Sequence, residues 1–554
     1  MILHSSALIE EYTRAGHWGR RTLLDRLREN LAHCPDRTAV VDPPDRPDLV
    51  GSPSRSVTWA ELGRAAEAVA TALVDRGLRE DEVVVLQLPN VWELVMLYLA
   101  VARAGGIPSP LPVQWRRHEL KDVAAATGAR FYIGGEQFKG FDHQAMARGI
   151  AGETRLETFL SLDEVSALAT GEADTDRLDG IPVDANDIFT LCWTSGTEAG
   201  PKGCPLSHNN WLFGSGNLTR LMRLEDGDRL LCAAPMVNMT GVGVLLVPWM
   251  LCAGTLLMHH PLNMQLLLRQ LTTENVQFTI LVPALLNMIG KHPDVDALDL
   301  SSVRTICTGS APPSAWSLQE FKRRWDIEIN NLWGQNEGTS LIGGPQDVPD
   351  LERRVDHLPW WGRAGCDWPS GIEGVQVKLV DGEGRECREP GDVGELAYRG
   401  PNLFPGYYGR DDLNARAFDA EGYYCTGDLF RVMDACHVGF FDRKKDIIIR
   451  GGFNISAAEV ENLALSHPGI ADAAAVAVPD ETMGERVCLC IVARDPANPP
   501  ALADVTGFLR EQGIATYKLP EALLRLEEIP RNPVGKVLKK DLRQRARDEA
   551  ARNG

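Results

Sequence analysis

A loop rich in small and hydroxyl residues follows an apolar segment near residue 190. Residues 188–210 read IFTLCWTSGTEAGPKGCPLSHNN. Small residues let backbone N–H groups approach an oxyanion, hydroxyls donate further hydrogen bonds, and Lys202 supplies a compact cation. Gly and Ser alone would fit an ordinary flexible turn equally well. We predict a phosphate-binding loop, with the candidate residues Thr194, Ser195, Gly196, Thr197 and Lys202.

This loop differs from the P-loop of nucleoside triphosphatases. The P-loop motif requires Gly directly before Lys and Ser or Thr directly after it. Here Pro201 precedes Lys202 and Gly203 follows it. The P-loop interpretation therefore fails.

Six further segments follow the loop in a fixed order. Together with the loop they resemble the adenylate-forming superfamily, which contains acyl- and aryl-CoA ligases, peptide-synthetase adenylation domains and firefly luciferase. The resemblance covers nearly the whole chain, and residues 88–111 are most similar to benzoate- and cyclohexanecarboxylate-type CoA ligases and dihydroxybenzoate-AMP ligases. The six segments are TGSAPP (308–313), NLWGQNEG (331–338), GELAYRGPNLFPGYY (394–408), YYCTGDL (423–429), FFDRKKDIIIRGGFNISAAEVE (440–461) and NPVGK (532–536).

The resemblance implies a reaction in two steps. A carboxylate attacks the α-phosphorus of ATP, giving an acyl-adenylate and pyrophosphate, and the thiol of CoA then displaces AMP. The implied cofactors are ATP, Mg²⁺ and CoA as co-substrate, and the implied partners are a small acid and, in some relatives, a carrier protein. Positioning and electrostatic stabilisation dominate catalysis of this kind. The residues implied to be catalytic are Lys536, Glu337 and Lys202.

Four charged residues match family positions with defined roles. Lys536 matches the adenylation lysine, whose ammonium can bridge carboxylate and phosphate. Glu337 matches the carboxylate that holds Mg²⁺. Asp428 matches the acceptor of both ribose hydroxyls, and Arg443 is expected to support that contact. Taken singly, each would more commonly be a solvated surface charge or a turn cap.

Other matched positions complete the nucleotide site and the mobile part. The resemblance implies that Lys445 occupies the family's hinge position. Hinges are usually a few residues at the end of an element. Rotation there would withdraw Lys536 and bring the loop of Gly451 and Gly452 to the adenylate for the thiol step. The remaining nucleotide-binding candidates are Ser310, Ala311, Pro312, Trp333, Gly334, Gln335 and Asn336, of which the first three would line the adenine.

Several residues depart from the common family pattern. Glu198 and Ala199 stand where Thr and Gly are usual, which puts a carboxylate near the expected pyrophosphate. Asn336 replaces threonine, but its carboxamide can still donate to a phosphate oxygen. Asn238 stands where many relatives have an aromatic residue at the acid pocket, so the resemblance does not identify the acid substrate. We expect a compact acid. The candidate pocket residues are Asn238, Met239, Thr240, Gly241, Val282, Pro283, Gly309 and Leu341.

Periodicity indicates the elements that must position these residues. Thr58 and Glu61 form a capping box before an amphipathic helix. Strands at 82–88 and 129–135, a helix at 90–104 and a strand-then-helix at 278–289 give a βα rhythm. Such a rhythm predicts parallel sheets covered by helices.

The second half of the chain changes character. Short strands at 375–381 and 394–400 lie among Gly and Pro turns, and the last 110 residues or so mix strands with helices at 457–466 and after 536. We predict an α/β fold. Residues 1–442 would form a large N-terminal domain of helix-covered sheets, with a β-rich subdomain at about 345–442, and residues 443–554 a small mobile α+β C-terminal domain.

Composition limits the remaining function classes. The net charge of -19 repels nucleic acid, and 44% hydrophobic with 24% charged residues is typical of a globular protein. The 12 cysteines contain no Cys-x-x-Cys pair, and no basic leader precedes the first apolar run, so we expect a reducing cytoplasm. The uncharged run at 233–268 approaches a membrane span in length, but Pro248 and Gly254 divide it. We therefore predict burial within the protein and no membrane span.

Three functional interpretations remain open. The first is an acid:CoA ligase. The second is an adenylating enzyme with another acceptor or acid, such as a carrier-protein arm, an amine, or nitrite activated for diazo formation. The third is a non-catalytic relative that binds a nucleotide or an acid. Glu198 and Asn238 favour the third, and the joint presence of Lys536, Glu337 and Asp428 argues against it.

Overall fold

The computed structural model describes residues 1–194, 200–450, 453–480, 482–532 and 536–553. It divides into two compact units, Met1–Gln376 with Tyr398–Tyr424 and Val377–Ala397 with Cys425–Gly554. The predicted α/β class, with a large N-terminal part and a small C-terminal part, is confirmed. The predicted border between residues 442 and 443 and the predicted subdomain limits stay predictions.

An eight-stranded sheet forms the centre of the first unit. Its inner strands are all parallel, and an antiparallel strand closes each edge. In spatial order the strands are β14 (Ser340–Gly343), β13 (Glu328–Gly334), β12 (Thr305–Gly309), β11 (Phe278–Ile280), β9 (Arg229–Cys232), β10 (Thr255–Met258), β1 (Thr38–Val41) and β2 (Ser56–Thr58).

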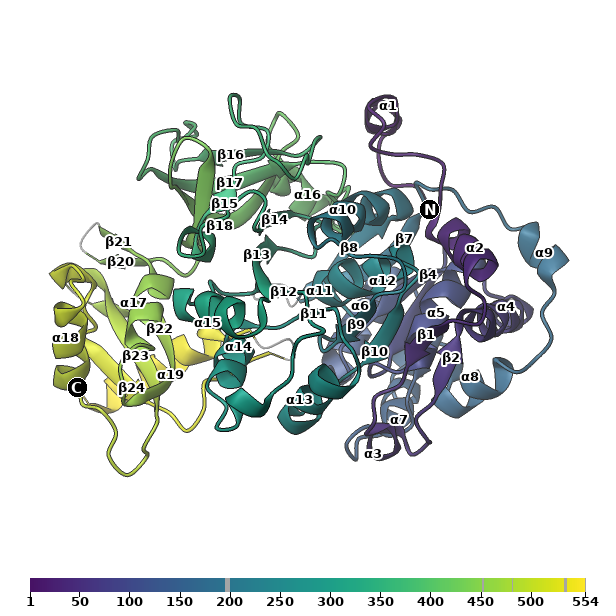
Figure 1. The fold of residues 1–554 in the computed structure, drawn as a ribbon, viewed down its shortest axis with the longest axis horizontal. Helices are drawn as coiled ribbons and strands as arrows, with labels where there is room; N and C mark the ends of the chain where they lie inside the picture. The colour runs from purple at the N-terminus through teal and green to yellow at the C-terminus, as the bar shows by residue number, and fades with distance from the viewer. Residues whose placement is uncertain (195–199, 451–452, 481, 533–535, 554) are drawn as a thin grey trace. The chain divides into compact units, whose positions relative to one another are not determined.

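Helices cover this sheet with apolar side chains. One buried cluster joins Leu231 and Ile306 of the sheet to Leu267, Leu286 and Phe321 of three helices. These helices are α13 (Met264–Thr273), α14 (Pro283–Gly290) and α15 (Ala315–Trp325), which lie beside β11 to β13 in Figure 1. Burial of large aliphatic side chains of this kind contributes roughly 1.5 to 3 kcal/mol each.

A second sheet of the first unit is wholly parallel, in the order β4 (Ile107–Pro110), β3 (Val83–Gln87), β5 (Phe131–Gly134), β6 (Thr158–Leu160). The helix α5 (Trp92–Arg103) connects β3 to β4 and is buried on all sides. The predicted capping box is present, since Thr58 and Glu61 bond each other's backbone at the start of α4 (Trp59–Asp75). The predicted βα rhythm is thus confirmed here.

The first unit contains further helices and strands (Figure 1). They are α1 (Ser6–Arg14), α2 (Leu23–His33), α3 (Arg46–Val50), α6 (Arg117–Thr127), α7 (His143–Arg148), α8 (Leu162–Leu168), α9 (Thr175–Asp179), the strand pair β7 (Ile188–Thr194) and β8 (Lys202–Ser207), α10 (His208–Leu221), β15 (Leu358–Pro359) and α16 (Asp411–Ala417).

The uncharged run near residue 250 is buried within the first unit. It forms α11 (Met239–Gly241), a π-helical turn (Val242–Leu246) and α12 (Val247–Leu251), and it ends in strand β10. Every residue from 241 to 250 is buried. Across the described ranges of the chain, no helix combines the length and the hydropathy that crossing a bilayer requires.

The second unit contains two groups of strands. The first group is β16 (Gln376–Val380), β17 (Val393–Arg399), β18 (Tyr424–Val432) and β19 (His437–Arg443), and the unit borders fall inside the first three of these strands. The second group is β21 (Phe453–Ile455), β20 (Ile448–Arg450), β23 (Gly484–Ala493) and β22 (Ile470–Asp480), with β24 (Ala522–Arg525) beside β23.

Helices pack on both faces of this smaller sheet. Helices α17 (Ala457–Ala464) and α18 (Leu502–Glu511) share one apolar cluster with β22 and β23. Helix α19 (Lys539–Asn553) inserts Leu542 and Ala546 into a second cluster with the alternate side chains of the same strands. Because successive strand residues point to opposite faces, the period of two explains how one strand supplies both clusters.

Candidate functional site

Strands β7 and β8 hold the two ends of the predicted phosphate loop. They pair antiparallel, and Thr194 lies opposite Lys202. The Nζ of Lys202 lies 4.9 Å from the ring centroid of Tyr407, a cation–π distance. The candidates Ser195, Gly196 and Thr197 lie outside the described residues. The structure therefore places Lys202 directly opposite Thr194, at the end of the strand pair from which the predicted loop extends.

Glu337 is a buried carboxylate, 6% exposed, in the turn that follows β13. The Tyr407 hydroxyl donates a hydrogen bond of 2.7 Å to its Oε1, and the Tyr407 and Tyr424 hydroxyls are 3.0 Å apart. Burial raises the pKa of Glu337, whereas the tyrosine hydrogen bonds and the charge of Lys202 lower that pKa in part. A buried carboxylate oxygen of this kind can serve as a ligand to a hard cation.

Replacing Tyr407 with phenylalanine is expected to raise the pKa of Glu337 further, because one donor to the carboxylate is lost. A hydrogen bond of this kind contributes about 1 kcal/mol, so we expect the Mg²⁺ requirement to rise roughly fivefold. The measurement is acid-dependent ATP–pyrophosphate exchange as a function of Mg²⁺. Tyr408→Phe is the control, and an equal rise in that variant would contradict this role of Tyr407.

Asn336 joins the end of β7 to the predicted acid pocket. Its Oδ1 accepts from the Met239 N–H at 2.8 Å, and its Nδ2 donates to the Trp193 carbonyl at 3.0 Å. The sequence analysis expected this carboxamide to donate to a phosphate oxygen, and that role stays a prediction. The structure adds a second role, because Asn336 fixes the position of Met239 relative to β7.

The first pocket residues form a tight turn before the buried helical run. Asn238 caps α11, since its Oδ1 accepts from the Gly241 N–H at 3.1 Å. Met239 and Thr240 are half-buried. A Cβ added to Gly241 would lie 2.2 Å from the Pro235 carbonyl oxygen, so only glycine fits there.

Substituting alanine for Gly241 is expected to destabilise the fold by about 1 to 3 kcal/mol, because the clashing atoms belong to the backbone. Urea unfolding measures the change. Gly216→Ala is the matched control: that glycine lies within α10, and a Cβ added there would meet nothing within 4 Å, so alanine should stabilise by up to about 1 kcal/mol. Equal stability of the two variants would contradict the packing described.

The other pocket and adenine candidates lie at the ends of the sheet strands. Gly309 ends β12, and its missing Cβ would meet the Leu332 carbonyl at 2.6 Å. Ser310 follows with a φ of 73°, a left-handed conformation that turns the chain sharply. Val282 and Pro283 start α14, and Leu341 is buried on β14. Ala311 and Gly334 are exposed, and Pro312, Trp333 and Gln335 are half-buried.

In the second unit, the predicted ribose pair lies across two strands. Asp428 on β18 and Arg443 on β19 are register partners, with 3.8 Å between Asp428 Oδ1 and Arg443 Nε. Asp428 is buried, whereas a third of the Arg443 side chain is exposed. A buried acceptor with an adjacent guanidinium is suited to a vicinal diol.

Asp442, the residue before Arg443 on β19, caps helix α17. Its Oδ2 accepts from the Ser456 hydroxyl at 2.9 Å and from the Ala458 N–H at 3.0 Å. The negative charge also favours a helix N-terminus. The carboxylate of Asp442 therefore fixes the start of α17 to the end of β19.

Lys536 and Lys445 also belong to the second unit. The Lys536 N–H donates to Asn532 Oδ1 at 2.8 Å, and the Asn532 N–H donates to the Lys536 carbonyl at 2.7 Å. The side chain of Lys536 is exposed. Lys445 lies in the turn between β19 and β20. The candidates Gly451 and Gly452 lie outside the described residues.

Two buried thiols lie on the strands that flank the predicted phosphate loop. Cys192 on β7 and Cys204 on β8 are register partners. Burial raises the pKa of Cys192 to about 12 and raises that of Cys204 well above its usual value. Among the cysteines that the structure describes as free, all but Cys425 are buried.

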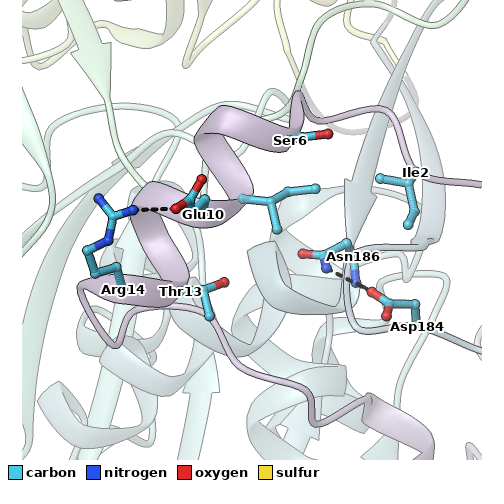
Figure 2. Close-up of a pocket in the computed structure, with 8 residues that line it drawn as sticks. Ile2, Ser6, Glu10, Thr13, Arg14, Asp184 and Asn186 are labelled. Atoms are coloured by element: carbon cyan, nitrogen blue, oxygen red, sulfur yellow. Dashed lines mark hydrogen bonds and ion pairs between the residues drawn. The ribbon is translucent and has the colours of Figure 1, made fainter.

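A hollow of about 560 Å³ lies on the first unit, apart from every predicted site residue. Figure 2 shows the Arg14–Glu10 ion pair on α1 and the hydrogen bond from Asn186 to Asp184 at its edges. The lining residues are Ile2, Ser6, Ile9, Glu10, Thr13, Arg14, Asp184 and Asn186.

Within the described part of the chain, no group of three or more His, Cys, Asp or Glu side chains could hold a metal ion.

Two known families match most of this chain. The AMP-binding enzyme family matches residues 27–408, and the AMP-binding enzyme C-terminal domain matches residues 459–536. The chain belongs to the AMP-binding enzyme family. It is a ligase that binds ATP and activates carboxylic acids as adenylates, as the sequence resemblance implied.

Relatives of this AMP-binding enzyme include both CoA ligases and AMP ligases. The medium-chain fatty-acid–CoA ligase of Escherichia coli is 32% identical over 96% of this chain and 93% of its own. The 2,3-dihydroxybenzoate-AMP ligase of Bacillus subtilis is 28% identical over 97% and 96%. Among solved structures, ATP-bound MatB from Rhodopseudomonas palustris has a TM-score of 0.82 at 25% identity, covering 96% and 100%.

Sequence reasoning did not single out several residues that shape the site of this AMP-binding enzyme. Tyr407 lies within the motif GELAYRGPNLFPGYY, and Tyr424 within YYCTGDL, so both motifs were recognised without a role for either hydroxyl. Trp193 contributes a backbone carbonyl, which leaves no side-chain signal in a sequence. Ser456 precedes a helix and could have been recognised as a cap.

Proposed function

We propose that this AMP-binding enzyme joins a compact aryl, alicyclic or short carboxylic acid to CoA. The observation that carries the proposal is the pairing, within one unit, of a buried carboxylate and a cation. Glu337 is held by Tyr407, and Lys202 lies over the same tyrosine ring. The identity to a fatty-acid–CoA ligase over nearly the full length of both chains supports the acceptor.

In the first step, a carboxylate oxygen of the acid attacks the α-phosphorus. The new P–O bond forms as the bond to pyrophosphate breaks, and the electron pair leaves with pyrophosphate. We assign Lys202 and Thr194 to the phosphates, and Asp428 with Arg443 to the ribose. The exposed ammonium of Lys536 is assigned to the charge that develops between the carboxylate and the phosphate.

Glu337 is assigned to hold Mg²⁺. A hard cation takes oxygen ligands and usually binds through one or two carboxylates plus phosphate oxygens and water, so one buried carboxylate fits. When bound, the ion neutralises charge on the phosphates. The protein's contribution is to keep the carboxylate in place, through the 2.7 Å hydrogen bond from Tyr407.

In the second step, a thiolate sulfur attacks the acyl carbon of the adenylate, and AMP leaves with the electron pair of the broken C–O bond. CoA is our proposed thiol. We assign the hinge between the two steps to Lys445 and the thiol-step contacts to Gly451 and Gly452. The acid pocket is assigned to the turn of Asn238 to Gly241, together with Val282, Pro283, Gly309 and Leu341.

A carrier-protein thiol is the second candidate acceptor. It is favoured by the similarity to the salicyl-AMP ligase / salicyl-S-ArCP synthetase of Mycobacterium tuberculosis, which is 29% identical over 96% of this chain. Both acceptors present a phosphopantetheine thiol, so they require the same second step.

A panel of carboxylic acids with ATP and Mg²⁺ tests the proposal. Release of AMP is measured with CoA, a carrier protein, an amine or no acceptor, and nitrite replaces the acid in one arm. We expect an aryl, alicyclic or short acid to give AMP and a thioester with CoA. AMP formation with the carrier protein but not with CoA would favour the second candidate. If none of the acids supports ATP–pyrophosphate exchange, both candidates are rejected.

A further inference from the structure

The backbone contacts of the predicted hinge change between Lys444 and Lys445. The Lys444 N–H donates to the Gly427 carbonyl at 2.9 Å, and its Nζ lies 2.8 Å from Glu395 Oε2, so Lys444 is attached to β17 and β18. The next two residues contact a different element. Nη2 of Arg543, on helix α19, donates to the Lys445 carbonyl at 3.1 Å and to Asp446 Oδ1 at 2.6 Å.

Helix α19 is itself firmly anchored. Leu542 is fully buried beside Arg543. At the first residue of the helix, Lys539 Nζ lies 2.8 Å from Oε1 of Glu461, which also accepts from the Ala475 N–H at 2.7 Å. Both ends of the Lys539–Glu461 ion pair are mostly buried. The start of α19 is therefore fixed to α17 and β22.

The anchored helix directly follows the segment that carries Lys536. The reciprocal hydrogen bonds of Asn532 and Lys536 close this segment, and Arg531 on its other side pairs with Asp472 at 2.7 Å. The path from the hinge to Lys536 thus runs from the Lys445 carbonyl to Arg543, through the anchored helix α19, and then along the chain from Lys539 back to Lys536.

We propose that Arg543 is a positioning residue that fixes the hinge residues Lys445 and Asp446 to the helix following Lys536, so that hinge and lysine move as one body. The inference rests on the proposed function, in which Lys536 serves adenylation. It extends that function by naming the residue through which the hinge controls the position of Lys536.

The side-chain chemistry explains why arginine serves here. A guanidinium presents several donors in a fixed plane, is always charged, and can satisfy a carbonyl and a carboxylate together. The Asp446 side chain is 9% exposed, and that of Arg543 is 26% exposed. Removing one partner from a mostly buried ion pair leaves the other charge without compensation. Arg543→Lys retains the charge but not the planar donor set.

Two half-reactions of Arg543→Met test the proposal. We expect the kcat of ATP–pyrophosphate exchange in the presence of the carboxylic acid to fall on the order of tenfold or more. A catalytic group misplaced by about 1 Å can lower the rate by at least that factor. The KM for ATP and thioester formation from supplied acyl-adenylate should stay within about twofold, and Arg543→Lys should recover part of the loss. Arg547→Met, an exposed arginine one turn further along α19, is the matched control.

Amide hydrogen exchange gives a second measurement that needs no activity. In Arg543→Met, but not in Arg547→Met, the amides of Asp446 and Ile447 and those of Lys536 and Leu542 should lose protection together. Unchanged protection in either segment, or an equal loss of both half-reactions, would overturn the inference. A wild-type protein that forms no adenylate would reject the proposed function, while the exchange measurement would still decide the role of Arg543.

Discussion

Replacing Lys536 with alanine is expected to lower formation of the acyl-adenylate by roughly 10²- to 10³-fold, the usual cost of removing one preorganised charge from a transition state. The thioester step from supplied acyl-adenylate should be largely retained, because charge no longer develops at the phosphorus. The variant should remain folded, because the side chain of Lys536 is exposed. The hydrogen bond of Lys536 to Asn532 uses the backbone N–H, which alanine retains. ATP–pyrophosphate exchange and thioester formation are the two measurements.

Lys540→Ala is the control for this variant. Lys540 is also exposed and lies at the start of α19, so its loss changes the net charge equally. We expect both half-reactions to stay near the wild-type rates. An equal loss of both half-reactions in Lys536→Ala would show that the lysine acts through stability or substrate binding and not in adenylation.

The second large effect is expected for Glu337→Gln. The glutamine keeps the volume and can still accept from Tyr407, but it lacks the negative charge assigned to Mg²⁺. We expect adenylation to fall about 100-fold at a fixed Mg²⁺ concentration and to recover in part at high Mg²⁺. Titration of Mg²⁺ in the exchange assay checks this. Glu386→Gln, which removes the charge of an exposed acidic residue with no assigned role, should titrate like the wild type.

The pH dependence of Glu337 has a defined sign. Its folded pKa is raised above the usual 4.5, chiefly by burial. Its contribution to stability is therefore present below the unfolded pKa and is lost as pH rises through the folded pKa. At neutral pH, Glu337→Gln should unfold at a higher temperature than the wild type, although it is less active. A lower melting temperature would contradict the buried-charge account.

Acidification should also weaken Mg²⁺ use by the wild type, because protonation removes the ligand charge. The Mg²⁺ concentration for half-maximal exchange should rise as pH falls toward the raised pKa of Glu337. In Glu337→Gln the corresponding dependence should disappear.

Much of the fold followed from patterns that depend on local physics. The capping box of Thr58 and Glu61 and the buried strand β3 have signals within a few residues. The uncharged run near 250 was also interpreted correctly, because Pro248 and Gly254 limit how long one helix can be. The π-helical turn had no such signal, since its residues differ in no way from those of an α-helix.

The site was predicted as a set of motifs but not as a set of contacts. Glu337 was named from its motif, whereas its partner Tyr407 lies 70 positions later and is brought near only by the tertiary fold. Likewise, the link from Arg543 to Lys445 spans 98 positions. Contacts at such separations leave no periodicity in a single sequence, so they could not be predicted.

The buried thiols have a consequence for an enzyme that makes reactive acyl groups. An acyl-adenylate reacts with any thiolate it meets, and a thiol is far less nucleophilic than a thiolate. Cys192 and Cys204 lie on the strands that flank the predicted phosphate loop, but burial raises their pKa values, so both thiols stay protonated at physiological pH. We expect Cys192 and Cys204 to escape acylation by the adenylate and to resist alkylating reagents, so that these two thiols do not consume the activated intermediate.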